Sequence, residues 1–299
     1  MNDLANARTP VIDGLGRIAE RYDVVLCDLW GVIHNGRHAF PAAADALARF
    51  RGRGGVAILI SNAPRPNAPI RQQLDQLRVP RQAYDAVVTS GDVTVDLIRA
   101  RGSAPVHHIG PERDLSLFDA IEALAPGSSP PRAPLDEAAY VLCTGLFDDT
   151  REKVEDYDAT FATMLQRKLT MICANPDLVI HRGDELIYCA GALAERYEKK
   201  GGETIYAGKP HAQIYEEALK RAAAARGAPL DKSRVLAIGD AMRTDIAGAL
   251  AQSIDALFVT SGIHRDELLG LSALDAAAIE QFAARHGMRP TAMIEELTW

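Results

Sequence analysis

The sequence predicts an α/β fold built on a parallel sheet, and three observations lead to it. Short buried runs of aliphatic and β-branched residues alternate with amphipathic helical segments along the chain. Several of these runs end on polar or charged residues, as strands do at the ligand-binding edge of an open parallel sheet. With 299 residues the chain is also longer than one modest core requires, which favours two domains.

Composition narrows the class of protein. The apolar fraction is 47% and the charged fraction 24%, which is ordinary for a globular protein. There are 33 basic and 40 acidic residues, a net charge of −7, so the total charge does not favour nucleic acid or an anionic membrane as a partner. The N-terminal residues lack the apolar run of a signal peptide, and no stretch has the length of a membrane span. We therefore expect a cytoplasmic protein.

The four cysteines indicate a reducing environment. Cys27, Cys143, Cys173 and Cys189 lie far apart, form no CxxC pair and mostly fall inside strand-like runs. Buried free thiols are the better interpretation, and a zinc site is not expected. Cys27 adjoins an aspartate, but successive strand side chains face opposite ways, so we expect it to be a packing residue.

The first strand brings a carboxylate to the edge of the sheet. The buried run at 24–27 is followed directly by Asp28, and the stretch continues to Gly36. A helical pattern at 11–19 precedes it, and a helix from Phe40 to Arg53 follows, with Pro41 in its first turn. The next buried strand, 56–60, stops on Ser61 and Asn62.

The α/β alternation continues from residue 66 to about 202, which we interpret as a second α/β domain. The proline-rich segment 126–134 is a loop within it. The predicted helices are 70–77, 92–101 and 151–167, and the predicted strands are 86–88, 106–109, 140–143 and 170–173.

The last third of the chain supplies the remaining charged strand ends. Strand character returns at 204–207, just before Gly208 and Lys209. Asp240 and Asp245 follow the buried run at 235–238. A helix at 212–226, another helix after Asp245, a strand at 256–259 and a C-terminal helix at 275–286 complete the pattern.

Four strand ends therefore carry chemistry of one kind. Carboxylates at 28, 240 and 245, with one lysine and a hydroxyl, suit a hard divalent cation such as Mg²⁺ that holds a phosphate. The lysine would offset the charge of phosphate oxygens and carboxylates. Each feature alone has an ordinary explanation: a turn at 61–62, a surface lysine, and aspartates that cap helices. It is their joint order that favours a site.

In this order the motifs resemble those of the haloacid dehalogenase (HAD) superfamily of aspartate-nucleophile hydrolases, and within it the class IIA, NagD-like phosphatases. The strand that ends in Asp28 resembles the first motif, ILIS ending at Ser61 the second, GKP at Lys209 the third, and GDAMRTDIAGA the fourth. TSGDVT at 89–94, ANPD at 174–177 and CAGALAERYE at 189–198 also resemble class IIA segments. The resemblance covers nearly the whole chain.

The resemblance implies a Rossmann-like catalytic core at 1–66 and 203–299, with an inserted α/β cap of the C2 type at 67–202. Mg²⁺-dependent hydrolysis of a small phosphate monoester, such as a sugar phosphate or a nucleotide-derived phosphate, would proceed through an aspartyl-phosphate on Asp28. Possible homodimer formation through the cap is a further implication. The implied catalytic residues are Asp28, Ser61 and Lys209, the implied substrate-binding residues are Asn62, Gly31, Asn175 and Asp177, and the implied metal ligands are Asp28, the Trp30 carbonyl, Asp240 and Asp245.

Trp30 departs from the family pattern. Phosphatases of this family usually carry there a second aspartate, which protonates the leaving group, and an indole cannot exchange a proton near neutral pH. General acid–base help is worth about 10² to 10⁴ in rate. The departure predicts a slow phosphatase, one restricted to good leaving groups, or no turnover. His34 is a candidate replacement, since an ordinary histidine titrates near neutrality.

Two alternatives stay open at this point. Metal-free haloacid dehalogenases also place an aromatic residue at this position, but Asp240 and Asp245 would have no purpose in a metal-free site. The other alternative is a phosphate or metabolite binder that has lost turnover. Phosphate release with and without Mg²⁺, halide release from 2-haloacids, and tight phosphate binding without turnover would distinguish the three.

Overall fold

The computed structural model describes residues 9–183, 185–269, 281–282 and 284–299, and within them the chain forms two compact units. The first unit comprises Met1–Ile60, Leu77–Ala86 and Ala218–Trp299, and the second comprises Ser61–Gln76 and Val87–Glu217. None of the helices described is long and apolar enough to cross a membrane. The predicted domain bounds of 66 and 203 stay predictions.

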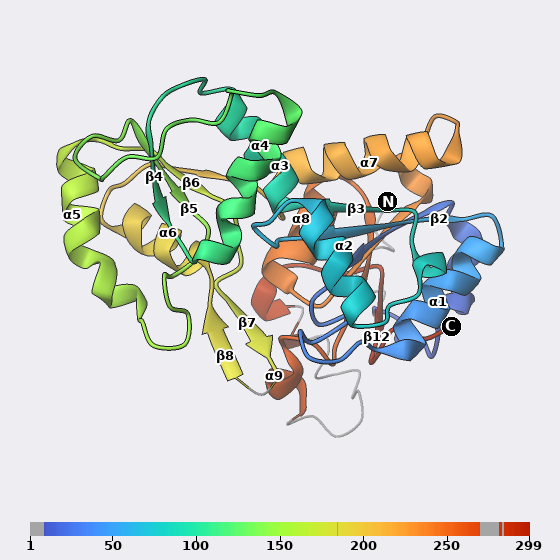
Figure 1. The fold of residues 1–299 in the computed structure, drawn as a ribbon. Helices are drawn as coiled ribbons and strands as arrows, with labels where there is room; N and C mark the ends of the chain where they lie inside the picture. The colour runs from blue at the N-terminus through green and yellow to red at the C-terminus, as the bar shows by residue number, and fades with distance from the viewer. Residues whose placement is uncertain (1–8, 184, 270–280, 283) are drawn as a thin grey trace. The chain divides into compact units, whose positions relative to one another are not determined.

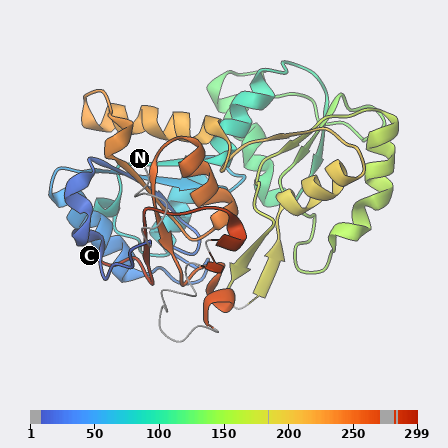
Figure 2. The same cartoon turned by 180° about the vertical axis from the view of Figure 1, so that it is seen from behind.

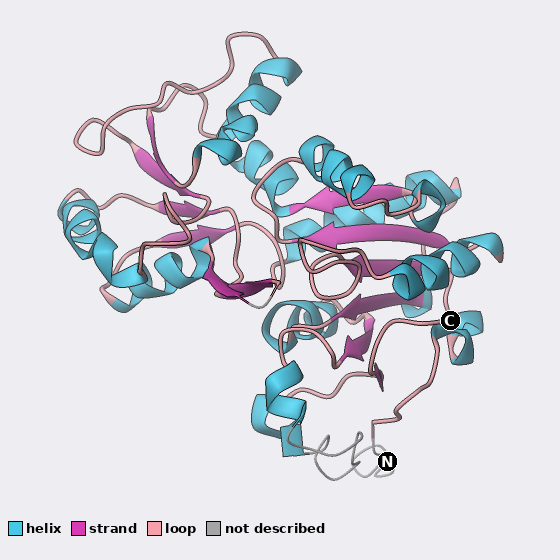
Figure 3. Cartoon of the chain, turned by 60° about the horizontal axis from the view of Figure 1, so that its bottom comes forward, coloured by secondary structure: helices cyan, strands magenta, loops and turns pink. Residues whose placement is uncertain are grey.

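The first unit is organised on a parallel sheet, drawn in Figures 1 and 3. The strand order is β12-β11-β10-β1-β2, with β3, which begins in this unit, as the sixth strand. The strands are β1 (Val24–Asp28), β2 (Val56–Ser61), β3 (Ala86–Thr89), β10 (Val235–Gly239), β11 (Asp255–Val259) and β12 (Ala292–Ile294).

Strand β1 lies inside this sheet and is buried along its whole length. Its near-continuous aliphatic sequence is typical of a parallel strand covered on both faces. The parallel register pairs Cys27 with Ile238 and Asp28 with Ile60. The carboxyl ends of β1, β2 and β10 therefore meet at one edge of the sheet, and Asp28 and the segment after Gly239 emerge there.

Short helices accompany the sheet of the first unit. The turn that follows β10 packs against β10, β11 and α8, and α8 also packs against β11. The helical segments are η1 (Leu15–Arg17), η2 (Ala19–Arg21), α1 (Pro41–Gly52), η3 (Arg81–Ala83), η6 (Lys232–Arg234), η7 (Met242–Ile246), α8 (Ala247–Ala251) and α9 (Arg265–Leu269). The long helix α7 (Ala212–Arg226) begins in the second unit and ends in the first.

The second unit has a four-stranded parallel sheet, in the order β4-β5-β6-β9, and a separate antiparallel hairpin, β7-β8. Figures 1 and 2 show this unit from its two sides. Its strands are β4 (Val106–Ile109), β5 (Tyr140–Cys143), β6 (Met171–Cys173), β7 (Val179–Arg182), β8 (Glu185–Tyr188) and β9 (Thr204–Tyr206). Its helices are α2 (Asn67–Gln76), α3 (Ser90–Arg99), η4 (Glu112–Leu115), α4 (Ser116–Leu124), η5 (Val154–Tyr157), α5 (Asp158–Gln166) and α6 (Ala190–Lys199).

Two apolar clusters cover the two faces of this second sheet. Val141 and Met171 face α5 and α6, packing with Phe161 and Tyr197. The alternate residues of the same strands, such as Leu142, face α3 and α4. The alternation follows from the two-residue period of a strand. The second unit therefore has three layers, and its α/β class is the one that the sequence predicted.

The α/β class and most elements are confirmed, with some differences. Helix α7 and strand β5 have the predicted bounds. The predicted helix at 11–19 is wrong: Val11 bridges to Met293, and only two 3₁₀ turns follow. The helix predicted at 151–167 is shorter, since a 3₁₀ turn precedes α5. Helix α4 and the hairpin β7-β8 were not predicted. Most of the predicted helix 275–286 lies outside the described residues.

Candidate active site

Three buried carboxylates gather at the carboxyl edge of the first unit's sheet. Asp28, at the end of β1, is 6% exposed, and Asp240 and Asp245, after β10, are 5% and 4% exposed. Each offers an oxygen, and the three oxygens lie within 4.8 Å of one another. Unit charges at about 4 Å repel by roughly 4 kcal/mol at an effective dielectric constant of 20. An arrangement of this kind favours a divalent cation among the oxygens.

Glycines make room for these carboxylates. A Cβ atom on Gly31 would lie 2.0 Å from Oδ2 of Asp240, and one on Gly262 would lie equally close to the same oxygen. Gly31 also has a φ of +84°, a backbone angle that residues with a side chain rarely adopt. A Cβ on Gly239 would lie 2.2 Å from Cγ of Asp245. Two of the three carboxylates are thus closely surrounded by main chain.

Backbone N–H groups orient the same side chains. Ile263 donates its N–H to Oδ2 of Asp240 at 2.7 Å, and Ala241 donates to Oδ2 of Asp245 at 3.1 Å. Asp245 lies in the π-helical turn η7, a rare conformation that often occurs at functional sites. These hydrogen bonds fix the orientation of the two carboxylates.

The donor set fits a hard divalent cation. All three side chains supply oxygen, they come from two segments of one unit, β1 and the turn after β10, and they are buried where hydration is limited. Mg²⁺ prefers such a set and completes its shell with water and phosphate oxygens. A softer ion would favour nitrogen or sulfur ligands. The predicted clustering of Asp28, Asp240 and Asp245 therefore has a structural basis.

Trp30 is part of a tight turn after β1. The Gly31 N–H donates to the His34 carbonyl at 2.8 Å, and the rings of Trp30 and His34 meet edge to face with centroids 5.1 Å apart. A Cβ on Gly36 would lie 2.6 Å from the indole. The half-buried indole thus packs on its own turn. In the same turn Gly31 has no side chain, which leaves space for Asp240. The contact between Gly31 and substrate stays a prediction.

His34 is poorly suited to be the missing general acid. It is 2% exposed, and burial lowers its pKa from 6.5 to about 4, so it is neutral near pH 7. Its Nδ1 accepts the N–H of Gly36 at 3.0 Å. A general acid must carry a proton it can release at the working pH. The structure therefore argues against His34 in this role.

In the second unit the side-chain amide of Asn62 joins three segments. Its Oδ1 accepts the Lys209 N–H at 2.7 Å, and its Nδ2 donates to the Lys209 carbonyl at 3.1 Å. The same Nδ2 donates to Oδ1 of Asp177 at 2.9 Å. One amide thus holds both main-chain polar groups of Lys209. The side chain of Asn62 thus fixes the main chain of Lys209. Lys209 as a whole residue is 2% exposed.

The turn before Lys209 is held equally closely. Gly208 has a φ of +105°, and a Cβ there would lie 2.6 Å from Oδ1 of Asn62 and 2.8 Å from Oγ of Ser90. Ser90 donates its hydroxyl to the Ala207 carbonyl. Ser61, the last residue of β2, is 6% exposed, and its Oγ accepts the Ala63 N–H at 3.2 Å.

Asn175 and Asp149 belong to separate polar groups of the second unit. Asn175 is buried, and its side chain accepts the Asp177 N–H at 3.1 Å, which orders the ANPD loop. Asp149 instead pairs with Arg113 and Arg182, at 2.6 and 2.7 Å. These ion pairs hold the pKa of Asp149 below its usual value, although burial opposes them.

His107 contacts the Ala133 carbonyl and His108 contacts the Thr144 hydroxyl, so the two adjacent histidines have separate partners. The prediction for the cysteines is confirmed. All four cysteines are buried free thiols. Burial raises the pKa of Cys143 to about 12, which makes that thiol unreactive at neutral pH.

Sequence reasoning missed the loop after β11. Gly262 and Ile263 pack directly on Asp240, but nothing in the local sequence marks them as site residues. Their position after a buried parallel strand is the one available signal, because every such strand ends at the same edge. His264, Glu267 and His286 form a further cluster that was not predicted.

Comparison with known proteins places this arrangement in a family. The model of the haloacid dehalogenase-like hydrolases matches residues 25–123, and a HAD-hydrolase-like model matches residues 206–290. A solved structure of a hydrolase of the haloacid dehalogenase-like family from Brucella suis 1330 is 43% identical, with a TM-score of 0.84, and covers 96% of this chain and 100% of that one.

Two characterised relatives are more distant. The 5'-nucleotidase YutF of Bacillus subtilis is 24% identical over 250 residues, covering 82% of this chain and 90% of YutF. The D-glycerol 3-phosphate phosphatase of Mycobacterium tuberculosis is 28% identical over 255 residues, covering 83% of this chain and 65% of that enzyme. Together with the fold and the three carboxylates, these matches show that the chain belongs to the haloacid dehalogenase-like hydrolases, in their NagD-like class IIA.

Proposed function

We propose that this protein is a Mg²⁺-dependent phosphatase that hydrolyses a small phosphate monoester through an aspartyl-phosphate. The observation that carries the proposal is the cluster of Asp28, Asp240 and Asp245, whose oxygens lie within 4.8 Å of one another. The relatives named as a nucleotidase and a glycerol phosphate phosphatase support a small phosphorylated substrate, such as a sugar or nucleotide-derived phosphate.

Asp28 is the proposed nucleophile. One of its carboxylate oxygens attacks phosphorus, the bond between phosphorus and the ester oxygen breaks, and the leaving oxygen takes a proton from solvent water. Water then attacks the aspartyl-phosphate, which releases inorganic phosphate and restores the carboxylate. Burial of Asp28 at the end of β1 limits its hydration, which keeps the carboxylate reactive.

Asp240 and Asp245, with one oxygen of Asp28 and the carbonyl of Trp30, are the proposed metal ligands. Mg²⁺ bound there would offset the charge of the phosphate oxygens as the nucleophile approaches. The Gly31, Gly239 and Gly262 main chain and the Ile263 N–H keep the two later carboxylates in place. The backbone ligand at position 30 is unaffected by the change from aspartate to tryptophan.

Lys209 and Ser61 are the proposed contacts of the transferring phosphoryl group. Asn62 is a positioning residue in this scheme, since its side chain holds the Lys209 main chain through two hydrogen bonds. Its backbone N–H is the proposed contact with phosphate. Asn175 and Asp177 are proposed to form the substrate side of the cap, with Asp177 bound to Asn62. Homodimer formation and a cytoplasmic location are parts of the same proposal.

Trp30 sets the expected substrate range. Because neither the indole nor His34 can protonate the leaving group, esters with acidic leaving groups should react much faster than alkyl esters. The experiment is a series of aryl, acyl and alkyl phosphates with the wild-type protein and Asp28→Asn, each with and without Mg²⁺. The proposal expects Mg²⁺-dependent phosphate release that depends steeply on the pKa of the leaving group and is lost in Asp28→Asn.

Other outcomes have definite meanings. Phosphate release by Asp28→Asn at the wild-type rate would exclude Asp28 as the nucleophile. Metal-independent halide release from 2-haloacids would instead show a dehalogenase. Phosphate binding without turnover of any ester would show a binder. A flat dependence on the leaving group would show that another residue supplies the proton.

A further inference from the structure

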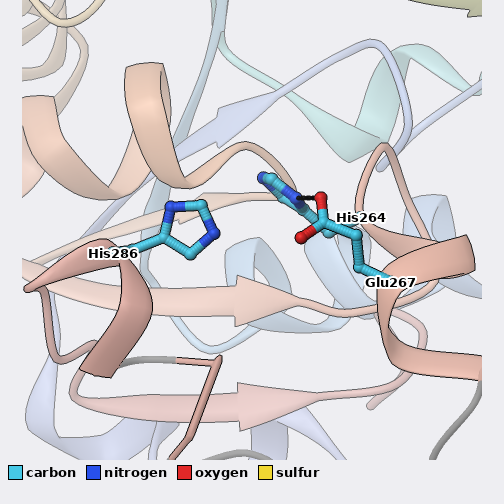
Figure 4. Close-up of side chains that lie close together, drawn as sticks. All are labelled: His264, Glu267 and His286. Carbon is cyan, nitrogen blue, oxygen red and sulfur yellow. Dashed lines mark hydrogen bonds and ion pairs between the residues drawn. The ribbon is translucent and has the colours of Figure 1, made fainter.

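A second cluster of potential metal ligands lies in the first unit, apart from the three aspartates. His264, Glu267 and His286 each offer one ligand atom, and these atoms lie within 4.8 Å of one another. His264 belongs to the loop after β11, Glu267 to α9, and His286 to a helical segment near the C-terminus. Figure 4 shows the carboxylate of Glu267 directed toward the histidine rings.

The two imidazoles are held by aromatic packing. The His264 and His286 rings meet nearly edge to face, with centroids 5.3 Å apart and planes at 70°. Phe282 contacts both rings, at 5.2 Å and 4.6 Å between centroids, and is itself fully buried. This packing restricts the rotation of both rings, so a ligand would meet an ordered pair of nitrogens.

Access also suits an ion. The Glu267 side chain is 50% exposed and that of His264 is 14% exposed, so the cluster opens to solvent on the carboxylate side. An ion can therefore reach the three ligand atoms from that side.

We propose that His264, Glu267 and His286 form a second metal site, selective for a borderline transition ion such as Zn²⁺ over Mg²⁺. Two nitrogen ligands and one carboxylate, with a fourth position open to water, are a zinc-type set, whereas Mg²⁺ requires oxygen ligands. Zinc bonds of about 2.0–2.2 Å in a tetrahedral shell place the ligand atoms about 3.4 Å apart. The three ligand atoms must therefore shift when the ion binds, and the half-exposed Glu267 side chain can adjust.

The hydrogen bonds of His264 show what the ion would change. Nδ1 lies 2.7 Å from Oε1 of Glu267, and Nε2 accepts the Met242 N–H at 3.3 Å. Nδ1 therefore carries the proton and shares it with the carboxylate. A metal ion bound at Nδ1 takes the place of this proton, which passes to solvent, and the ring takes up a proton from solvent at Nε2, so that it stays neutral with no net loss of protons.

This change links the second site to the first. A protonated Nε2 can no longer accept the Met242 N–H, so His264 must move away from the turn after Asp240. The residue before His264 is Ile263, whose N–H holds Asp240. Zinc at the second site should therefore loosen one of the proposed Mg²⁺ ligands. This consequence rests on the proposed function, whereas zinc binding itself does not.

Binding is tested without using activity. Co²⁺, a spectroscopic substitute for zinc, is titrated into the full-length protein with excess Mg²⁺ to occupy the aspartates, and visible absorption and bound metal are measured. We expect one Co²⁺ per chain with the absorption bands of a nitrogen-ligated site. His286→Ala should abolish the bands, and Glu267→Gln should weaken binding by at least about tenfold, as loss of even a supporting partner does.

The controls separate this site from the others. His38→Ala removes an exposed histidine of the same unit and should leave the spectrum unchanged. Asp240→Asn should also retain the bands. If the wild-type protein binds no Co²⁺ in excess Mg²⁺, or if His286→Ala and Glu267→Gln both bind as the wild type does, the site does not exist. Because Glu267 is exposed, its substitution remains informative even if His286→Ala fails to fold.

Discussion

The first unit carries two clusters of potential metal ligands that differ in every property that selects an ion. Asp28, Asp240 and Asp245 are buried, supply oxygen alone and are enclosed by glycine main chain. His264, Glu267 and His286 are partly exposed, include two nitrogens and are supported by aromatic rings. The first arrangement favours a hard ion in a fixed geometry, and the second favours a borderline ion that exchanges with solvent.

The comparison teaches that neither cluster can be assigned by counting ligands. Both bring three ligand atoms within 4.8 Å. Their surroundings also differ: Asp240 lies directly against the main chain at Gly31 and Gly262, whereas the side chain of Glu267 is 50% exposed to solvent. A rigid surround holds a catalytic geometry, and a mobile ligand permits reversible binding.

The largest expected effect is that of Asp28→Asn. Removal of the nucleophile should lower kcat by about 10⁴-fold or more, as seen when catalytic nucleophiles are removed elsewhere. Co²⁺ absorption from the histidine cluster should be unchanged, since Asp28 takes no part in it. Asp45→Asn, which alters an exposed carboxylate on α1, is the matched control and should retain full activity. Loss of both turnover and Co²⁺ absorption in Asp28→Asn would mean that the two clusters are not independent.

The next effect is that of Gly262→Ala. The added methyl group would lie 2.0 Å from Oδ2 of Asp240, so the carboxylate or the loop must shift. A displacement of about 1 Å at a reacting centre costs about 10²-fold in rate, and we expect a loss of this size with weaker Mg²⁺ activation. Gly52→Ala, with nothing within 4 Å of the added atom, is the control. Equal activity of the two variants would show that Asp240 is not held by contact with this loop.

These glycines also show where sequence reasoning ends. The class of fold, the second α/β unit and the strand before Asp28 follow from local periodicity, because a buried parallel strand has to be apolar along its length. The close approach of Gly262 to Asp240 depends on residues 22 positions apart, and no local pattern encodes it. The same holds for Asn62 and Lys209, which are 147 positions apart.

The histidines also show what a local sequence pattern cannot predict. The sequence around His34 allows a role as an acid, but the fold buries its side chain. His264 and His286 are separated by 22 positions and are brought together around Phe282 by the fold. Burial and tertiary neighbours decide the chemistry of a histidine, and neither is visible in a single sequence.

The third prediction contrasts buried His34 with the partly exposed cluster. The pKa of His34 is about 4 in the folded protein and 6.5 for an unperturbed histidine, so the unfolded chain binds a proton at this residue more readily than the folded protein does. The contribution of His34 to the free energy of unfolding should therefore be fully present above pH 6.5. It should fall by about 1.4 kcal/mol per pH unit as the pH drops toward 4. Denaturant unfolding of wild type and His34→Asn across this range measures it, since asparagine can still accept the Gly36 N–H but does not titrate.

His38→Asn is the matched control for this measurement, because His38 is exposed in the same segment of chain. It should keep the wild-type slope between pH 6.5 and 4, whereas His34→Asn should flatten it. Equal slopes in all three proteins would show that His34 is not buried in the neutral form.

The smallest expected effect is that of zinc at the histidine cluster on turnover at the aspartate cluster. If zinc at His264 Nδ1 removes the acceptor of the Met242 N–H and loosens Ile263 from Asp240, it should lower Mg²⁺-dependent turnover by about fivefold, the lower end of allosteric coupling. Phosphate release is measured against Zn²⁺ at several Mg²⁺ concentrations. Inhibition that persists at high Mg²⁺ and disappears in His286→Ala would support the link. Inhibition that high Mg²⁺ relieves in both proteins would instead show that zinc competes at the aspartates, because direct displacement does not require the histidines.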